Sequence, residues 1–279
     1  MHPRHDLFRT PLLGALIAAF CALLSPAAAA PSLPYVFDMV HHNPGEAKTP
    51  TQFLDPQVLK AWGFNGNIPR EFVQAAVNYD SYDPDTFPAG STERAWVENY
   101  AREIDVLFNS MKAAGQPCYP FTDFIVLPKS LVKKYQADIC DDQGRVDISR
   151  TKTKEILRAM IAEIFNRFPA LGGLTVRHGE TYLHDVPYHT GGNPIINGET
   201  SHIELINLIR DEICVKRNKL LFYRTWDFGN MHDKPAYYLG VTDHVEPHPN
   251  LLFSIKHQLG DFHRLSRFNP CLGIGKHRQ

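Results

Sequence analysis

The chain has 279 residues, of which 43% are hydrophobic and 21% are charged, and its formal net charge at pH 7 is −1. This apolar content excludes an intrinsically disordered chain. A charge so close to zero gives no bulk attraction to nucleic acid or anionic lipid, so we expect a small or neutral molecule as the partner. The length suits one large barrel or two small domains.

The first thirty residues have the organisation of a secretory signal peptide. Arg4 and Arg9 make the start basic, residues 11–24 form a short apolar run, and three alanines end at Ala30. This pattern is typical of a cleavable signal, and the run is too short to span a bilayer. A buried helix is the alternative, but the basic flank and the alanines favour export. We predict cleavage after Ala30 and a secreted or periplasmic protein, residues 31–279, with no membrane span.

Beyond the signal peptide, short β-type runs alternate with helical patterns. The β-type runs are residues 35–40, 62–67, 118–127, 173–176, 220–225 and 251–256. The helical patterns between them cover residues 96–111, 149–169, 201–214 and a short segment from 233. Ser201 and Glu204 have the spacing of a capping box, which predicts the start of the third helix. Pro235 is expected near the start of the fourth.

This alternation predicts parallel β-α-β units and leaves two architectures, an open doubly wound sheet or a barrel. No glycine-rich phosphate loop follows the first run, which disfavours the nucleotide-binding sheet. We therefore predict the α/β class with a (β/α)8 TIM-barrel fold. Six of eight strands can be counted before Gln279, so we expect an incomplete barrel, truncated at its C-terminus.

Polar and aromatic residues are frequent at the C-terminal ends of these β-type runs, where a barrel places its active site. They are His41, His42, Asn65, Asp123, Glu180, Arg224, Trp226, Asp227, Lys256 and His257.

Two carboxylates among the later runs have the setting that glycoside hydrolysis requires, one as acid and one as base. Glu180 comes just after the fourth run, in a loop rich in His, Tyr and Gly, and Arg177 and His178 flank it. Asp261 lies between Gly260 and Phe262 after the sixth run. Each could instead be a salt-bridged surface carboxylate. We predict that Glu180 and Asp261 are catalytic.

The fifth run ends in residues suited to binding an anionic sugar. Arg224 can bind a carboxylate through two parallel hydrogen bonds, and Trp226 can stack on the apolar face of a sugar ring. The alternative is a core tryptophan with an arginine in the helix layer.

Together these segments resemble the α-glucuronidases of glycoside hydrolase family 67, barrel enzymes that remove glucuronic acid branches from xylan with inversion. The similar segments are Val176-Arg177-His178-Gly179-Glu180, Tyr223-Arg224, and Ile255-Lys256 followed after four residues by Asp261-Phe262-His263. The resemblance covers roughly residues 172–264.

The resemblance implies an exported glycosidase in which Glu180 protonates the glycosidic oxygen and Asp261 activates water. Arg177, His178 and Arg224 would bind an anionic sugar, with Lys256 assisting and Trp226 stacking on the ring. A barrel that binds carbohydrate without turnover is the first alternative, and the expected truncation favours it.

Histidines suggest a further alternative, a metal-dependent hydrolase. The chain has 14 histidines but no HxH or HExxH motif, and Pro247 makes a helical pair of His244 and His248 unfavourable. We predict no metal and no cofactor.

Four cysteines lie beyond the signal peptide. They are either buried thiols or form structural bridges, and for two bridges three pairings are possible. The four are Cys118, Cys140, Cys214 and Cys271.

Overall fold

A computed structural model describes residues 33–39, 49, 51–177, 181–192, 195–226, 230–256 and 267–279. The chain divides into two compact units, residues 1–35 and 36–279. Every helix and strand named below belongs to the second unit.

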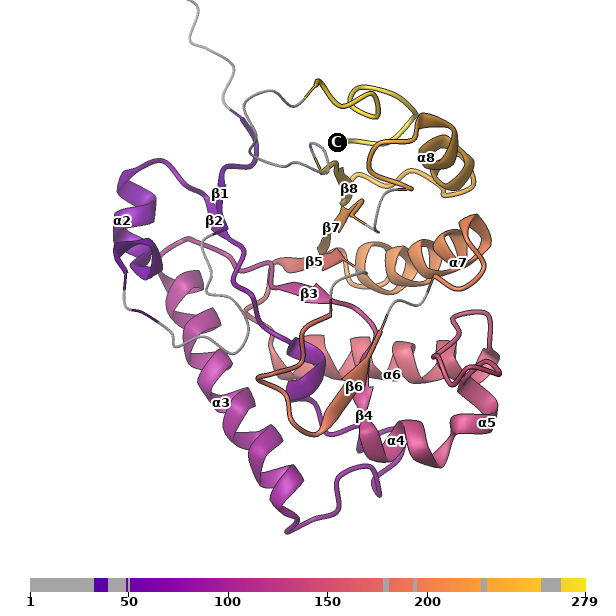
Figure 1. Cartoon of the computed structure of the whole chain (residues 1–279). Coiled ribbons are helices and arrows are strands. Elements are labelled where there is room, and N and C mark those ends of the chain that lie inside the picture. Colours follow the sequence, from indigo (N-terminus) through magenta and orange to yellow (C-terminus); the bar gives the residue numbers. More distant parts are fainter. Residues whose placement is uncertain are drawn as a thin grey trace, which may run out of the picture. The chain divides into compact units, whose positions relative to one another are not determined.

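A sheet of parallel strands forms the centre of this unit (Figure 1). In the described part of the chain its strands are β1 (Phe37–Asp38), β2 (Gly66–Asn67), β3 (Phe121–Asp123), β5 (Gly173–Arg177), β7 (Leu220–Arg224) and β8 (Leu251–Ser254). β1 pairs with β2, and β3, β5, β7 and β8 pair in that order. Parallel bridges from Asn67 to Cys118 and from Arg70 to Phe121 join the two groups. The strands follow chain order, without the reversal of a doubly wound sheet.

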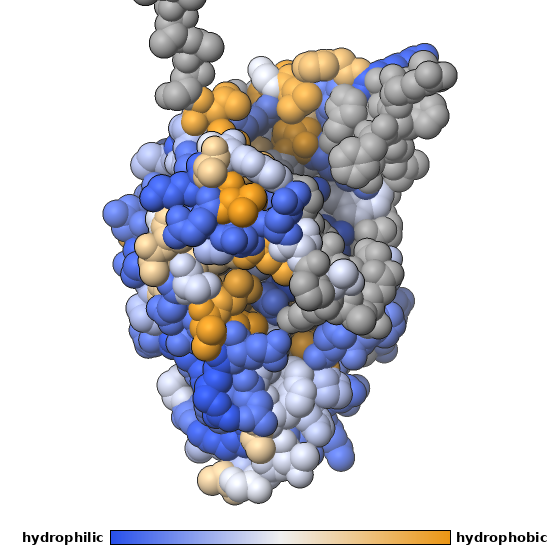
Figure 2. All heavy atoms as spheres, turned by 90° about the vertical axis from the view of Figure 1, so that its left-hand side faces the viewer, coloured by the Kyte–Doolittle hydropathy of each residue, from blue (hydrophilic) through white to orange (hydrophobic). Residues whose placement is uncertain are grey.

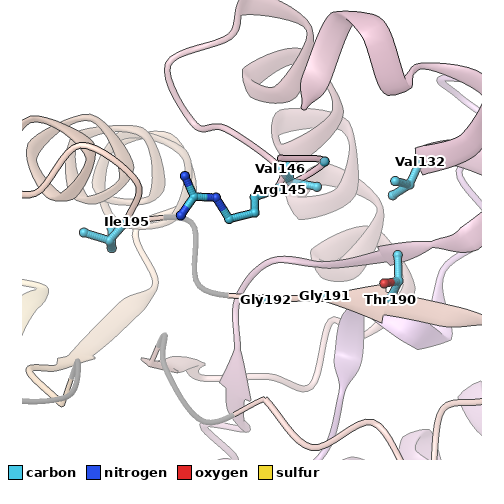
Figure 3. A pocket seen from close by; sticks show the side chains of 8 residues that line it. Val132, Arg145, Val146, Thr190, Gly191, Gly192 and Ile195 are labelled. Carbon is cyan, nitrogen blue, oxygen red and sulfur yellow. The ribbon is translucent and has the colours of Figure 1, made fainter. Parts of the chain in front are cut away.

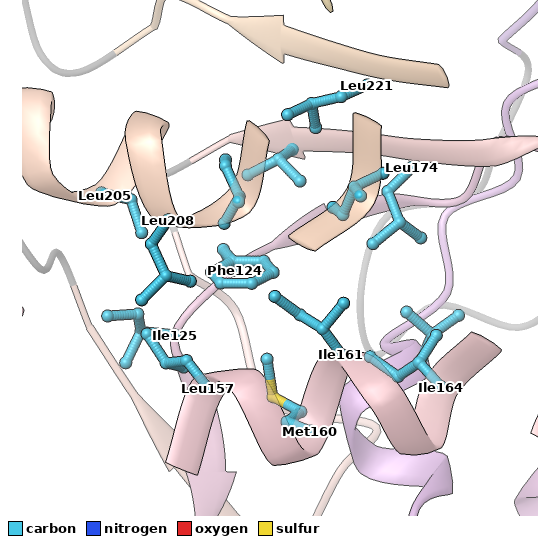
Figure 4. Close-up of a cluster of buried hydrophobic side chains, with 14 of the residues drawn as sticks. Phe124, Ile125, Leu157, Met160, Ile161, Ile164, Leu174, Leu205, Leu208 and Leu221 are labelled. Carbon is cyan, nitrogen blue, oxygen red and sulfur yellow. The ribbon is translucent and has the colours of Figure 1, made fainter. Parts of the chain in front are cut away.

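Helices cover the outer face of this sheet. Leu174 of β5 and Leu221 of β7 lie toward α6 (Thr151–Arg167) and α7 (Glu199–Ile209), in a cluster that Phe124 completes (Figure 4). All of these leucines and Phe124 are fully buried. α8 (Pro235–Thr242) adds Tyr238, whose ring meets Phe253 of β8 at 5.8 Å. Burial of such side chains is the main favourable contribution to the stability of this layer.

The opposite, inner face of the sheet carries its own aromatic layer. Phe37 of β1 stacks on Tyr119 at 4.7 Å between ring centroids and meets Phe222 of β7 edge-on at 5.2 Å. β1 and β7 are not neighbours in the sheet, so the sheet must curve strongly to bring their side chains together. Curvature around a layer of inward-pointing side chains is the geometry of a barrel interior. The fold is an incomplete α/β barrel, as the sequence predicted.

Two glycines make room for this aromatic layer. A Cβ atom at Gly66 would lie 2.5 Å from the ring of Phe37, and one at Gly172 would lie 2.7 Å from the ring of Tyr119. Both distances are shorter than carbon atoms can approach without displacement. The glycines are therefore a packing requirement of the barrel interior.

The longer helices form where the sequence supplies one apolar stripe and a start signal. α3 (Thr92–Ala113) buries Val97, Ile104 and Phe108 on one side, and the hydroxyl of Ser91 accepts a hydrogen bond from the backbone N–H of Arg94 at 3.1 Å. That bond satisfies one of the free donors of the first turn. The remaining elements are η1 (Gln52–Leu54), α2 (Pro56–Ala61), η2 (Val73–Ala76), β4 (Val126–Pro128), α4 (Lys129–Lys134), α5 (Gln136–Ile139), β6 (His189–Gly191) and η3 (Arg210–Val215).

The structure corrects two local predictions. The expected capping box is wrong, because α7 begins at Glu199 and Ser201 is buried inside its first turn, where its hydroxyl accepts from the backbone N–H of Asn197. The run expected at 118–127 is two strands, because β4 leaves the barrel and pairs antiparallel with β6. This antiparallel pair lies beyond the carboxyl end of β3 (Figure 1).

The face formed over α2 and α3 is mainly hydrophilic, with separate apolar patches (Figure 2). This is the ordinary surface of a solvent-exposed helix layer. Within the described residues, no helix is both long and apolar enough to cross a membrane. The four cysteines beyond the expected signal peptide are all buried free thiols.

Candidate functional site

Four of the seven residues predicted to form the site lie in the described part of the chain. They are Arg177, Arg224, Trp226 and Lys256. Glu180, Asp261 and His178 lie outside the described residues. The structure therefore bears on the expected binding residues, while the two expected catalytic carboxylates remain predictions.

Strand register brings three of the expected binding residues to one edge of the barrel. Arg177 ends β5, Arg224 ends β7, and Lys256 follows the end of β8 by two residues. Arg224 stands opposite Ser254 in the ladder. Parallel strands put their carboxyl ends at the same edge, which is where barrels bind their ligands. Arg70 joins these residues from the segment after β2, and we call Arg70, Arg177, Arg224 and Lys256 the basic cluster.

Arg177 is held by a carboxylate from the neighbouring strand. Its Nε donates to Oδ1 of Asp123 at 2.8 Å and its Nη2 donates to Oδ2 at 3.2 Å. The two residues are partners in the ladder, and their exposed fractions are 9% and 3%. A two-point pair of this kind fixes the plane of the guanidinium as well as neutralising its charge. Arg177 is thus oriented by Asp123.

Arg224 lies over the same aromatic ring as Arg177. The guanidinium carbons of the two arginines are 5.2 and 4.9 Å from the centroid of the Phe121 ring. Nη1 of Arg224 also approaches the sulfur of Met39, beyond β1, at 3.0 Å. These contacts place Arg224 on the inner face, directed toward the first strand. The Phe121 ring attracts both cations through its negative face.

Lys256 and Trp226 form a tight contact at the β7–β8 side. The ammonium nitrogen of Lys256 lies 3.4 Å from the centroid of the Trp226 ring, and the ring of His232 meets Trp226 edge-on at 5.0 Å. Trp226 is only 5% exposed. In this conformation the ring supports Lys256, and a sugar could stack on that face only if Lys256 moved.

Arg70 is the member of the basic cluster that the sequence analysis did not identify. It pairs with Phe121 through a single parallel bridge, and its guanidinium carbon lies 5.9 Å from the ring centroid of Tyr182. Burial lowers the pKa of Arg70, and the charge of Arg177 lowers it further, whereas Asp123 and Asp185 act in the opposite direction. The only signal in the sequence is an arginine three residues after a β-type run.

The charge balance of these residues favours an anionic ligand. The basic cluster carries four positive charges, against which Asp123 is bonded to Arg177 and Asp185 acts on Arg70 from nearby. Partly buried cations attract anions more strongly than exposed ones because the surrounding dielectric is lower. Guanidinium groups also match the geometry of a carboxylate. The arrangement can therefore bind and orient an acidic group at the carboxyl ends of β5 and β7.

The described residues offer little support for a metal centre. They contain no group of three or more His, Cys, Asp and Glu side chains arranged to hold a metal ion. Three of the described histidines are buried in the fold, and burial lowers the pKa of His189 and that of His202 to about 3. His202 bonds the hydroxyl of Tyr237 at 2.7 Å. These two rings are neutral core side chains.

A separate cavity of about 320 Å³ lies between the α4–α6 region and β6 (Figure 3). Its lining is mainly aliphatic or glycine, and its one charged side chain, Arg145, is paired with Asp141 at 2.7 Å. The described residues of this lining include no carboxylate, histidine or thiol that could serve as acid, base or nucleophile. The lining residues are Val132, Gly144, Arg145, Val146, Thr190, Gly191, Gly192 and Ile195. The basic cluster remains the stronger candidate site.

Comparison with known proteins adds distant structural similarities only. No family model and no curated protein matches the chain. Dispersin B aligns with a TM-score of 0.43 and 12% identity over 72% of this chain and 57% of its own. A β-galactosidase from the psychrophilic Marinomonas ef1 aligns with a TM-score of 0.42 and 10% identity, over 79% and 40%. An exo-β-N-acetylglucosaminidase of family GH20 from Vibrio harveyi gives 0.35 and 12%, over 55% and 24%.

These structures are glycoside hydrolases with barrel folds. The chain spans between 24% and 57% of their lengths. Because the TM-scores are below 0.5, the barrel assignment above rests on strand order, register and the inner aromatic layer.

Proposed function

We propose that this chain is an exported glycoside hydrolase related to α-glucuronidases, acting on a carbohydrate that carries an acidic group. The observation that carries the proposal is the basic cluster on the inner face of the barrel, at the carboxyl ends of β5, β7 and β8. A neutral sugar would not require several partly buried cations, whereas a uronate carboxylate would be bound by them.

In the proposed reaction, the basic cluster binds the uronate and so fixes the position of the glycosidic bond. Glu180 donates a proton to the leaving oxygen, and Asp261 removes a proton from the attacking water on the opposite face of the sugar. Inversion needs the two carboxyl groups about 6.5–9.5 Å apart, which leaves room for that water. Glu180 follows Arg177 by three residues and Asp261 follows Lys256 by five, so each is close in the sequence to a residue of the basic cluster.

The test measures release of glucuronic acid from glucuronoxylan oligosaccharides by the wild-type chain and by Glu180→Gln. We expect release by the wild type, and a loss of at least about 100-fold in kcat for the variant with little change in binding. Glu155→Gln is the matched control, because Glu155 is an exposed helix residue paired with Lys152 at 3.2 Å. It should act as the wild type does.

The possible results separate the proposed enzyme from its alternatives. Full activity of Glu180→Gln on this natural substrate would remove Glu180 from the acid role. Binding of glucuronate without any release would favour a carbohydrate-binding barrel. Loss of activity on treatment with a chelator would favour the metal-dependent hydrolase, and failure to bind any acidic sugar would contradict the proposal.

A further inference from the structure

We propose that Arg70, and not Arg177, supplies the guanidinium that binds the acidic group of the ligand on the β2–β3 side of the barrel. The inference rests on the proposed function and assigns the recognition step to a residue that the sequence pattern did not indicate. Three observations on Arg70, Arg177 and Asp123 support it.

The first observation is that Arg177 already has a two-point carboxylate partner. Asp123 accepts hydrogen bonds from its Nε and Nη2, and both side chains are almost completely buried. A ligand carboxylate would have to compete with Asp123 for the same donors. Arg177 is therefore best described as a positioning residue, which holds Phe121 and the carboxyl end of β5 in place.

The second observation is that the guanidinium of Arg70 has a hydrogen-bond donor without an acceptor. Its Nη2 is buried and makes no hydrogen bond, and no carboxylate among the described residues forms an ion pair with it within 4.0 Å. The Tyr182 ring at 5.9 Å helps to orient the guanidinium but accepts no conventional hydrogen bond. A buried donor without an acceptor costs free energy, and the structure tolerates few of them. A ligand oxygen would satisfy it.

The third observation is the position of Arg70. It bridges to Phe121, the ring that Arg177 and Arg224 both contact, so the three arginines converge on one part of the inner face. Burial outweighs the attraction of nearby carboxylates, and the pKa of Arg70 is accordingly lowered. A buried side-chain charge that lowers the stability of the ligand-free protein is typical of a site that binds a counter-ion.

This reasoning predicts opposite effects of one substitution on stability and on binding. Arg70→Met removes the charge but keeps an extended apolar side chain. Since the ligand-free protein no longer holds an unneutralised cation, we expect its Tm to rise by about 2–4 °C. Binding of D-glucuronate, measured by calorimetry, should weaken by about 10- to 100-fold, as for the loss of a charged hydrogen bond. Binding of the neutral analogue D-glucuronamide should change much less.

Arg102→Met is the matched control, because Arg102 is an exposed residue of α3 whose side chain bonds that of Asn99. It should change neither affinity. Equal glucuronate affinity of Arg70→Met and wild type would overturn this inference alone and leave the proposed function in place. A fall in Tm would show a structural role for Arg70 and would also overturn it. Failure of the wild-type chain to bind glucuronate would overturn the proposed function and this inference together.

Discussion

At the scale of single residues, we expect the buried ion pair of Asp123 and Arg177 to contribute strongly to the stability of the fold. Asp123→Asn removes the charge but keeps the size of the side chain, so the buried Arg177 guanidinium loses the carboxylate that binds it at two points. Breaking a buried ion pair in this way destabilises a protein by about 3–5 kcal/mol. We expect a loss of that order in the free energy of unfolding, measured by urea denaturation.

The comparison for this prediction is an ion pair that water can reach. Asp80 accepts two hydrogen bonds from Arg94, but its side chain is 46% exposed. Exposed pairs contribute about 0–1 kcal/mol, so Asp80→Asn should have a small effect. Equal losses for the two variants would mean that Asp123 does not neutralise a buried charge.

The sequence predicted part of the candidate site at this scale. Arg177, Arg224 and Lys256 each lie at or directly after the end of a recognisable β-type run, and parallel strands bring such ends together. Arg70 could not be found in this way because it lies beyond a two-residue strand and joins the sheet through one bridge. The pairing of Asp123 with Arg177 also depends on register, which residue spacing along one chain does not determine.

At the scale of elements, the inner aromatic layer depends on the absence of one side chain. Gly66→Ala would place a Cβ atom 2.5 Å from Phe37 and 3.0 Å from Tyr119, so one of these rings would have to move. Overpacking of a core costs about 1–3 kcal/mol. We expect a decrease of that size in the free energy of unfolding. Gly192→Ala is the control, because no atom lies within 4 Å of the position its Cβ would take.

The same elements show what periodicity can and cannot predict. The runs expected at 173–176, 220–225 and 251–256 match β5, β7 and β8 closely, because each has consecutive apolar residues that are buried on both faces of the sheet. α2 was missed, and Trp62, expected in a strand, follows its last residue. β6 was also missed, since it exists only through its pairing with β4, more than fifty residues earlier. Short elements of this kind are determined by tertiary contacts.

At the scale of the whole molecule, strand order and the distribution of apolar side chains select the barrel. A doubly wound sheet carries helices on both faces, whereas here α6 and α7 pack on one face and aromatic rings from separated strands meet on the other. The sequence predicted this architecture from the alternation of elements. It could not show the curvature, which depends on Gly66 and Gly172 leaving room for Phe37 and Tyr119.

The proposed export of the chain can be tested through its thiols. The chain has five cysteines, and Cys21 alone falls within the predicted signal peptide. The other four are buried free thiols, and burial raises the pKa of Cys118 and of Cys214 to about 12 and that of Cys271 to about 11. Since the thiolate is the reactive form, these groups should react very slowly in the folded protein at pH 8.

Colorimetric thiol titration of the exported protein should therefore detect almost no reaction in buffer and four thiols per chain in denaturant. The uncleaved precursor, retained in the cytoplasm by deleting Arg4 and Arg9, should give five in denaturant, because Cys21 remains attached. Five thiols in the exported form would contradict cleavage after Ala30. Fewer than four would mean that disulfides form during export, and rapid reaction in buffer would contradict the burial of the thiols. An exported protein with four intact thiols would owe its stability in an oxidising compartment to the burial of those groups in the barrel and its helix layer.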